Sequence, residues 1–202
     1  RDPERPTNLN QKGIVLDGQD VVAEAKVYIA LNKPRGLIVS AVDEKGRDTV
    51  YRLLEGAGFP WLGAVGRLDK ASEGLILLTN DTEWAAGITS PASHLDKVYH
   101  VQVAGTPSQL TLTRMLDGVD ESGETLRVRG VRIMREGEKN SWLEIVLDEG
   151  RNRHIRRLLA ALDFEVLRLV RVAIGPLELG ELPKGQWRSL GAMEIQALTR
   201  NK

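Results

Sequence analysis

The 202-residue chain contains no cysteine. Disulfide bonds, thiolate metal sites and a cysteine nucleophile are therefore excluded, and this composition fits a reducing compartment such as the cytoplasm. No apolar stretch approaches the roughly 20 residues that a transmembrane helix needs, and the first residues do not resemble a secretory signal. Glycine-rich dinucleotide loops, Walker loops and HExxH motifs are missing, and the three histidines are not spaced like metal ligands. We therefore expect a cytoplasmic protein with no metal and no cofactor.

The chain also lacks a net charge, since lysine plus arginine equals aspartate plus glutamate at 28 each. A polyanionic partner is therefore not indicated by the overall charge. Positive charge is nevertheless concentrated in one place, because residues 150–172 hold six arginines against Asp163 and Glu165. Charge alone leaves a solvated basic surface and a nucleic-acid surface equally open.

The length allows one sizeable domain, with or without a small appendage. We divide the chain into a lead-in, residues 1–26, and a main domain, residues 27–202. The lead-in is polar, and residues 14–22 predict two short strands about an Asp-Gly turn. The chain begins with Arg1 rather than methionine, so we expect it to derive from a longer protein.

One stretch, residues 63–81, organises the rest of the chain. It places the carboxylate of Asp69 in a turn between Gly66 and Gly74, directly before an apolar run, residues 75–78, that reads as a buried strand. The two glycines permit backbone angles that a side chain would forbid, so the turn can be sharp and can approach a ligand closely. An acid on a loop held by a buried strand is well placed to react. Taken alone, it is equally an ordinary solvated turn.

The segment with the most charge predicts an amphipathic helix. Its apolar residues recur at i, i+3, i+4 and i+7: Ile155, Leu158, Leu159 and Leu162. Arg153, Arg156 and Arg157 lie away from this stripe. Adjacent helical residues point about 100° apart, so Arg156 and Arg157 are expected to serve different partners.

Further elements follow from periodicity and capping. Strands are predicted over residues 27–31, 36–42, 97–103, 142–148 and 166–174, with another near 126–134. Helices are predicted to begin after Asp48, after Asp81 or Thr82, and at Pro107 or Ser108, with a last one over residues 192–198. The core stripe of the third is predicted as Leu112, Met115, Leu116 and Val119.

Four segments together resemble one enzyme family. The run Gly-Arg-Leu-Asp-Lys-x-Ser-Glu-Gly-Leu-x-Leu-Leu-Thr-Asn-Asp, residues 66–81, is similar to the signature of RNA pseudouridine synthases of the RsuA-like branch, which acts on single uridines of ribosomal RNA. Asn-Lys-Pro-x-Gly (32–36), Gly-Arg-Asn-Arg-x-Ile-Arg-Arg (150–157) and residues 180–188 resemble further motifs in the same order. The resemblance covers about residues 27–190. His154 stands where most relatives have glutamine, which argues against a catalytic role for it.

This resemblance implies a fold, a reaction and a partner. The fold is α+β, a mixed and mostly antiparallel sheet flanked by helices, with a central cleft containing Asp69. The reaction converts uridine to its C-glycoside isomer without cofactor or metal, in ribosomal RNA or its precursor, and we favour the large-subunit RNA over the small-subunit RNA. The lead-in is a possible remnant or linker of an S4-type RNA-binding module, and we expect a monomer.

The resemblance also implies roles for individual residues. Asp69 is the essential carboxylate, either attacking C1′ or removing a ribose proton, and Arg156 is expected to pair with it. Tyr99 is expected to stack on the base and to act in proton transfer at C5, although its position on an alternating strand equally suits a core aromatic. Substrate binding is assigned to Arg67, Leu68, Lys33, Arg35, Lys97, Arg151, Arg153 and Arg157.

Two other functions remain open on the sequence. One is a binding-only ribosome-assembly factor on the same scaffold. The other is a nucleoside hydrolase or glycosidase with paired carboxylates, for which Glu73 is the only second acid near Asp69 in a comparable motif. RNA labelled with tritium at uridine C5 separates the three, because only isomerisation releases tritium and leaves pseudouridine.

Overall fold

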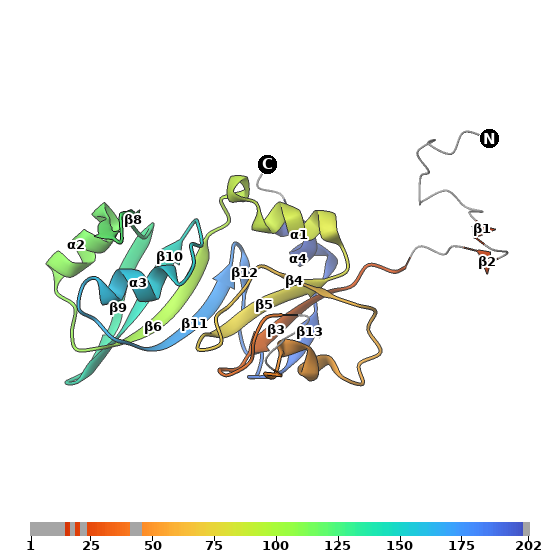
Figure 1. Cartoon of the computed structure of the whole chain (residues 1–202), viewed down its shortest axis with the longest axis horizontal. Coiled ribbons are helices and arrows are strands. Elements are labelled where there is room, and N and C mark those ends of the chain that lie inside the picture. The colour runs from red at the N-terminus through yellow and green to blue at the C-terminus, as the bar shows by residue number, and fades with distance from the viewer. Residues whose placement is uncertain (1–14, 17–18, 21–23, 41–45, 200–202) are drawn as a thin grey trace.

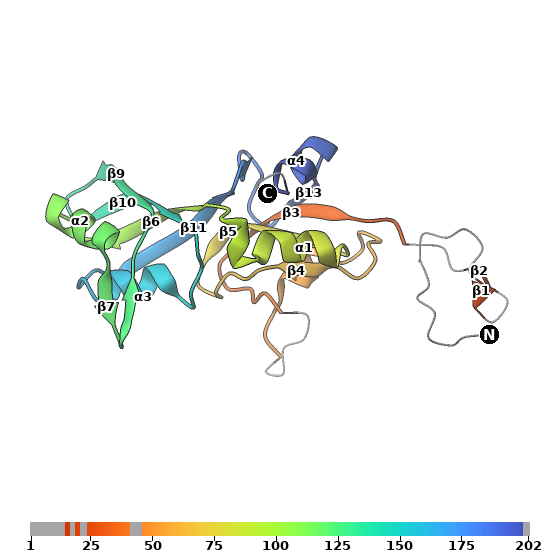
Figure 2. The same cartoon turned by 90° about the horizontal axis from the view of Figure 1, so that it is seen from above.

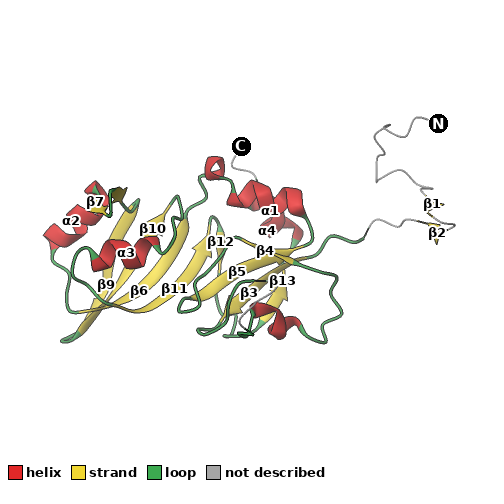
Figure 3. Ribbon diagram, in the orientation of Figure 1, coloured by secondary structure: helices red, strands yellow, loops and turns green. Residues whose placement is uncertain are grey.

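The computed structural model describes residues 15–16, 19–20, 24–40 and 46–199. Its centre is a nine-stranded mixed sheet, shown in Figures 1 and 3, with the strand order β13-β3-β5-β11-β6-β10-β9. The other two of the nine strands lie off this path: β4 pairs with β5, and β12 pairs with β11. The predicted α+β class and mostly antiparallel sheet are confirmed.

The strands are β1 Val15–Leu16, β2 Gln19–Asp20, β3 Tyr28–Lys33, β4 Gly63–Val65, β5 Glu73–Thr79, β6 Lys97–Ala104, β7 Val119–Glu121, β8 Glu124–Leu126, β9 Gly130–Glu136, β10 Asn140–Leu147, β11 Val166–Ile174, β12 Leu177–Glu178 and β13 Trp187–Ser189. The α-helices are α1 Thr82–Thr89, α2 Gln109–Asp117, α3 His154–Ala160 and α4 Ala192–Ala197. Two short 3-10 helices are η1 Val50–Leu54 and η2 Pro91–Ser93.

The large sheet consists of two antiparallel halves joined along one short junction. Strands β13, β3 and β5 form one half, and β11, β6, β10 and β9 form the other. At the junction β5 and β11 run parallel and share only two residue pairs, Val170 with Glu73 and Arg171 with Gly74. The halves lie side by side along the long axis of the molecule in Figures 1 and 2. Side chains that line this junction therefore come from distant parts of the chain.

Strand β5 is buried at all seven positions, so both faces of its half are covered. Ile76 and Leu78 belong to a large apolar cluster, while Leu75 and Leu77 pack with residues of α1 and α4 on the opposite face. Burying a leucine stabilises the fold by about 1.5–3 kcal/mol relative to leaving it exposed. The run predicted as a buried strand is confirmed, and it anchors the loop that precedes it.

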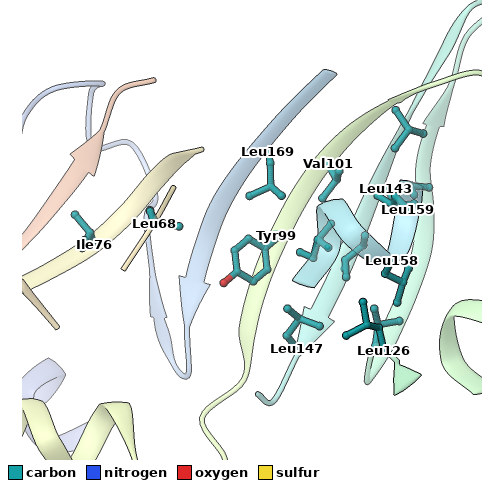
Figure 4. Close-up of a cluster of buried hydrophobic side chains, with 14 of the residues drawn as sticks. Leu68, Ile76, Tyr99, Val101, Leu126, Leu143, Leu147, Leu158, Leu159 and Leu169 are labelled. Atoms are coloured by element: carbon teal, nitrogen blue, oxygen red, sulfur yellow. The ribbon is translucent and has the colours of Figure 1, made fainter. Parts of the chain in front are cut away.

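The other half carries α3 on one face. The predicted stripe is buried, and Ile155, Leu158 and Leu159 pack in the same cluster as Val101 of β6 and Leu143 of β10. Figure 4 shows Leu158 and Leu159 above these strands. The predicted alternation of β6 is confirmed, and β11 spans the predicted residues 166–174.

The strand predicted over residues 36–42 is wrong for its described part. Residues 36–40 do not form a strand; Ile38 makes an isolated bridge to Thr49, while residues 41–42 of the prediction lie outside the described residues. The short helix predicted after Asp48 is present as the 3-10 helix η1, but the residue that precedes it as N-cap is Thr49, not Asp48. The carboxylate of Asp48 instead forms an ion pair with Arg52, one turn later. The Asp48 carboxylate cannot at the same time pair with Arg52 and accept hydrogen bonds from the first backbone N–H groups of η1.

Helix α1 begins as predicted after Asp81. The Asp81 carboxylate accepts hydrogen bonds from the Trp84 backbone N–H at 3.2 Å and from the Tyr28 hydroxyl at 2.6 Å. Lys26 lies 2.8 Å from it. Burial raises the pKa of Asp81, but these partners outweigh burial and hold the pKa at about 2.

Helix α2 begins as predicted, with Ser108 as its cap. Leu112 and Met115 are buried, but Leu116 is 42% exposed. The helix ends at Asp117, so Val119 is buried from strand β7 and the predicted stripe narrows to two residues.

The predicted hairpin of the lead-in is confirmed, since β1 and β2 are antiparallel partners. Its Asp-Gly turn lies outside the described residues, and the division at residue 26 remains a prediction. In the part of the chain that the structure describes, no helix is long and apolar enough to cross a membrane.

Candidate active site

The Asp69 loop connects β4 to β5 at the junction of the two halves. Gly66 and Gly74 adopt φ angles of +77° and +102°, which side chains rarely allow, so the predicted role of both glycines is confirmed. A Cβ atom on Gly74 would lie 2.2 Å from the carbonyl oxygen of Arg171. Only glycine therefore lets β5 approach β11 closely enough to form the junction. The backbone N–H of Ser72 donates to the Asp69 carbonyl at 3.0 Å and closes the turn.

Lys33 supports this loop from below, so its assignment to substrate binding is wrong. The side chain is 0% exposed, and its Nζ donates to the carbonyl oxygens of Ser72 at 2.7 Å and Pro34 at 3.1 Å. Burial lowers the pKa of Lys33 to about 8, although the carboxylates of Glu73 and Asp69 oppose this shift. A fully buried ammonium cannot reach a phosphate, and it instead fixes the path of the backbone beside Asp69.

Glu73 lies beside the loop as a buried structural acid. Arg168 donates to its carboxylate at 2.9 Å, and Lys184 lies 2.6 Å away. Burial raises the pKa of Glu73, but both cations outweigh burial and keep the pKa below its ordinary value. Glu73 is therefore an ionised and fully paired carboxylate.

A cavity of about 230 Å³ opens beside Asp69, where the two apolar clusters meet. Its polar lining includes Asp69, Lys97, Tyr99, Arg153, Arg156 and Arg171. A second hollow of about 470 Å³ shares the Asp69 loop with it and contains Arg67 and Arg151. Asp69 thus lies between two spaces, the smaller of which has an apolar wall.

Tyr99 forms part of this apolar wall. It lies on β6, 9% exposed, with Leu147 and Leu169 also lining the cavity. In Figure 4 the Tyr99 hydroxyl points away from Leu158 and toward the side of the cluster where Leu68 lies. Tyr99 therefore belongs to the apolar core and also lines the cavity.

The arginine nearest to Asp69 is Arg153, not Arg156. Arg153 Nη1 lies 3.8 Å from Asp69 Oδ2. The predicted ion pair between Asp69 and Arg156 is not formed, since Arg156 donates to the carbonyl oxygens of Ala71 at 3.1 Å and Val166 at 3.4 Å. Burial and the charge of Arg153 lower the pKa of Arg156, while the charge of Asp69 opposes this. Arg156 therefore links the Asp69 loop to β11 through the backbone.

Arg153 also has an unusual backbone. It precedes α3 with φ +49° and ψ +32°, a left-handed conformation that is strained for a residue with a side chain. Such strain collects at functional sites, where the surrounding structure maintains it. The conformation places a half-exposed guanidinium over the Asp69 carboxylate.

The remaining arginines of the segment are held by acids of the β7–β8 hairpin. Arg157 donates to Glu121 at 2.6 Å and to Glu124 at 2.7 Å. Arg151 donates to Glu124 at 2.7 Å and lies 3.2 Å from Glu149. Their predicted availability for phosphate is thus reduced. Sequence reasoning missed these acids because they lie about 30 residues away and join the site only through the hairpin.

The structure brings together most of the predicted site. Eight of the predicted residues line the first cavity: Arg67, Leu68, Asp69, Lys97, Tyr99, Arg151, Arg153 and Arg156. Lys33 and Arg157 do not, and Arg35 is exposed outside it, although its charge acts on Arg156.

Two further polar residues line the cavity: Arg171, which sequence reasoning did not assign to the site, and His154, for which it expected no catalytic role. The available signal for Arg171 was a charged residue in a strand whose other residues, apart from Arg168, are apolar. His154 is 3% exposed, and neither ring nitrogen has a well-formed hydrogen bond among the described residues. Burial lowers its pKa, which favours a neutral ring.

The described lining of this cavity holds one carboxylate and six cationic side chains. Together with the fold, this lining suits an enzyme that acts on nucleic acid. The chain belongs to the RNA pseudouridylate synthase family, whose model matches residues 27–161. It is therefore an isomerase of the RNA pseudouridine synthase type, as its resemblance implied.

Relatives and solved structures agree with this assignment. The chain is 40% identical to an "Uncharacterized RNA pseudouridine synthase" of Aquifex aeolicus over 92% of this chain and 74% of that protein. It is 35% identical to the "Ribosomal large subunit pseudouridine synthase B" of Bacillus subtilis, over 92% and 76%. A crystal structure of pseudouridylate synthase superposes with a TM-score of 0.74 at 32% identity, covering 87% of this chain and 75% of that one.

Proposed function

We propose that this protein isomerises single uridines of ribosomal RNA, in the large-subunit RNA or its precursor, with Asp69 as the essential carboxylate. The observation that carries the proposal is the cavity itself: among its described lining residues Asp69 is the only carboxylate, and it faces an apolar wall containing Tyr99. The Bacillus subtilis relative, whose name specifies the large ribosomal subunit, supports the choice of RNA.

The target base reaches Asp69 by leaving its stack. Residues of both halves of the sheet line the cavity, and its volume of about 230 Å³ is too small for a uridine that stays stacked between its neighbours. Extrusion of a base costs a few kcal/mol, and less in a loop than in a duplex. Arg67 is exposed and lines both hollows, which suits it to occupy the vacated space or hold the extruded nucleotide. The larger hollow then receives the neighbouring nucleotides.

Within the cavity the reaction needs few groups. The C1′–N1 bond breaks, and the Asp69 carboxylate either bonds to C1′ or removes a ribose proton. The uracil turns in place and its C5 bonds to C1′, while the Asp69–C1′ bond breaks or, on the other route, Asp69 returns the ribose proton. The C5 proton then leaves. Tyr99 stacks on the base and its hydroxyl takes part in the last transfer. Arg156 acts as a positioning residue, because it binds the Ala71 carbonyl of the Asp69 loop.

RNA is held by cations at the mouth of the cavity. Arg153 and Arg67 are exposed beside Asp69, and Arg35 is exposed nearby. Phosphate contacts from such residues orient RNA without reading its sequence. On this view the protein works in the cytoplasm as a monomer, without metal or cofactor.

The hydrolase alternative lacks a second acid. Paired-carboxylate glycosidases need one protonated carboxyl group near the scissile bond. Glu73, the candidate named from the sequence, is ionised and held by Arg168 and Lys184.

Ribosomal RNA fragments carrying tritium at uridine C5 test the proposal. We expect tritium release together with pseudouridine at one position of a large-subunit fragment, and neither product with Asp69→Asn. Release of free uracil would identify a hydrolase instead. Binding without any change in the RNA would identify a binding-only protein.

A further inference from the structure

Arg171 lies at the floor of the cavity with part of its guanidinium unused. It is 5% exposed on β11, where its backbone partners are Tyr99 on β6 and Gly74 on β5. Its Nε donates to the Leu75 carbonyl at 2.7 Å. Its Nη2 has no hydrogen-bond partner among the described residues, although the side chain lines the cavity.

A second cation lies beside it. Lys97 is two residues before Tyr99 on the same face of β6, and its Nζ donates a long hydrogen bond, 3.4 Å, to the Asp148 carbonyl. Burial lowers the pKa of Lys97 and the charge of Arg171 lowers it further, while Asp96 and Asp148 oppose the shift. Both side chains line the cavity, and the positive charge of Arg171 disfavours that of Lys97.

The lining as a whole has an excess of positive charge. Among the described residues it contains six lysines and arginines and one carboxylate, Asp69, which lies nearest to Arg153. The six cations are Arg67, Lys97, Arg151, Arg153, Arg156 and Arg171. A buried guanidinium with an unused donor destabilises the free protein unless an anion satisfies it. The floor of the cavity is thus arranged for negative charge that arrives with the substrate.

We propose that Arg171, together with Lys97, binds the uracil oxygens and stabilises the negative charge that the base carries after its glycosidic bond breaks. This inference rests on the proposed function. When C1′–N1 breaks, both bonding electrons stay on the uracil and spread over N1, O2 and O4. The electron-deficient C1′ is met by Asp69 or by loss of a ribose proton. When C5 bonds to C1′, these electrons form the new bond, and the Asp69–C1′ bond breaks or the ribose proton returns from Asp69. The C5 proton then leaves.

The position of Arg171 favours uracil over phosphate as its ligand. A phosphate within RNA is attached to chain on both sides and cannot reach the floor of a small cavity ahead of the base. The exposed Arg153 and Arg67 at the mouth are nearer to the backbone. A base stacked on Tyr99 instead brings its edge to the cross-strand neighbour of that ring, Arg171. A preorganised donor where charge develops is among the strongest catalytic effects, worth about 100- to 1,000-fold in rate.

The experiment varies the stability of the uracil anion. Fluorine at C5 withdraws electrons, so 5-fluorouracil is a better leaving group and needs less help. Single-turnover cleavage of uridine and 5-fluorouridine is measured in matched RNA fragments for wild type, Arg171→Gln and Arg171→Lys. We expect Arg171→Gln to lower the cleavage rate about 100-fold on uridine. On 5-fluorouridine the loss should be about 10-fold smaller, because the lost donor stabilises the leaving base and this base needs less stabilisation. Arg171→Lys should fall between wild type and Arg171→Gln.

Arg132→Gln is the matched control. Arg132 is exposed on β9 and forms an ion pair with Glu144 at 2.6 Å, away from the lining of the cavity. Its loss should leave both rates unchanged. A second readout is free uracil released from the RNA, which should increase in Arg171→Gln because the detached base is held less firmly.

Equal losses on both substrates would overturn the inference and leave Arg171 a structural residue. Weaker RNA binding with unchanged rates at saturation would overturn it in favour of a phosphate contact. Should Arg171→Gln fail to fold, Arg171→Lys carries the test, and its loss must again be smaller on 5-fluorouridine. Absence of pseudouridine with the wild-type protein would reject the proposed function itself, which is a separate outcome.

Discussion

The Asp69 loop and the segment from Arg151 to Arg157 face each other across the cavity, but different forces hold them. The loop is fixed by backbone hydrogen bonds and the fully buried Lys33. In the opposite segment, Arg151 and Arg157 are held by carboxylates of the β7–β8 hairpin, whereas Arg156 binds the backbone of the Asp69 loop and of β11. Exposed ion pairs are worth about 0–1 kcal/mol each and weaken with salt, whereas buried contacts do not. On the proposed function, we therefore expect changes in the Asp69 loop to alter the rate of isomerisation, and changes at Arg151 or Arg157 to alter RNA binding.

The largest effect should follow a change in the Asp69 loop. Asp69→Ala or Asp69→Asn should abolish isomerisation while leaving RNA affinity within a few-fold, because binding rests on arginines and phosphates. Activity and affinity are measured on the same RNA fragment. Activity above about a hundredth of wild type in either variant would contradict the assignment, given that a catalytic carboxylate is worth more than that.

Tyr99→Phe should also lose turnover but retain cleavage of the glycosidic bond. Stacking survives the substitution, and only the hydroxyl needed for the C5 proton is lost. RNA with 5-fluorouridine has no C5 proton to release, so wild type and variant should give the same product. A variant that fails to process this analogue would show that the hydroxyl acts earlier.

Arg156→Ala should lower the single-turnover rate by about 10- to 100-fold with little change in affinity, because misplacing a reacting group by an ångström has this effect. The reason is the bond from Arg156 to the Ala71 carbonyl. Arg156→Lys should restore only part of the rate, since an ammonium cannot bridge Ala71 and Val166 as a guanidinium does. A pure binding defect would instead group Arg156 with Arg151 and Arg157.

Arg157→Ala should behave oppositely and more weakly. Its loss leaves Glu121 and Glu124 uncompensated near the RNA, so affinity should fall about 2- to 10-fold while the rate at saturation stays unchanged. Glu121→Gln should strengthen binding because it frees Arg157. Binding constants at several salt concentrations measure both, and an Arg157→Ala defect in rate rather than affinity would erase the contrast.

The last prediction concerns the free energy of unfolding and its dependence on pH, and it should leave RNA binding and catalysis at neutral pH the least affected. The folded-state pKa of Lys33 is about 8, below its ordinary value of 10.5. Between these values the unfolded chain binds more protons, so stability should rise with pH across this window, by at most about 1.4 kcal/mol per pH unit. Lys33→Met should remove that contribution. Urea unfolding from pH 7.5 to 10.5 gives the slope of the unfolding free energy against pH for wild type and Lys33→Met. Equal slopes would show that burial does not lower the pKa of Lys33.

Local patterns were predictable from the sequence where one segment determines its own structure. The buried run of β5, the bounds of β11 and the Asp81 cap follow from periodicity and capping, and the resemblance supplied the family. The errors concern residues whose partners are distant in the chain. Lys33 looked like a surface charge in a turn, but it is covered by the loop almost forty residues later.

The same limit explains the errors among the arginines. No local pattern tells Arg156, which binds backbone carbonyls, from Arg157, which binds the hairpin acids. Arg171 was predicted as part of a strand and counted in the basic region 150–172, but not assigned to the site, because its place there depends on the register with β5 and β6. Strand pairing over such distances is decided by tertiary packing, which a single sequence does not display.

The two-residue junction between β5 and β11 also bears on how the protein is made. Its partners, Glu73 with Val170 and Gly74 with Arg171, are separated by almost one hundred residues, and contacts of such separation form slowly in folding. During synthesis the Asp69 loop leaves the ribosome long before the strand that completes its cavity. The nascent chain therefore carries the Asp69 loop before its cavity is complete, and on the proposed function we expect no isomerisation until β11 pairs with β5.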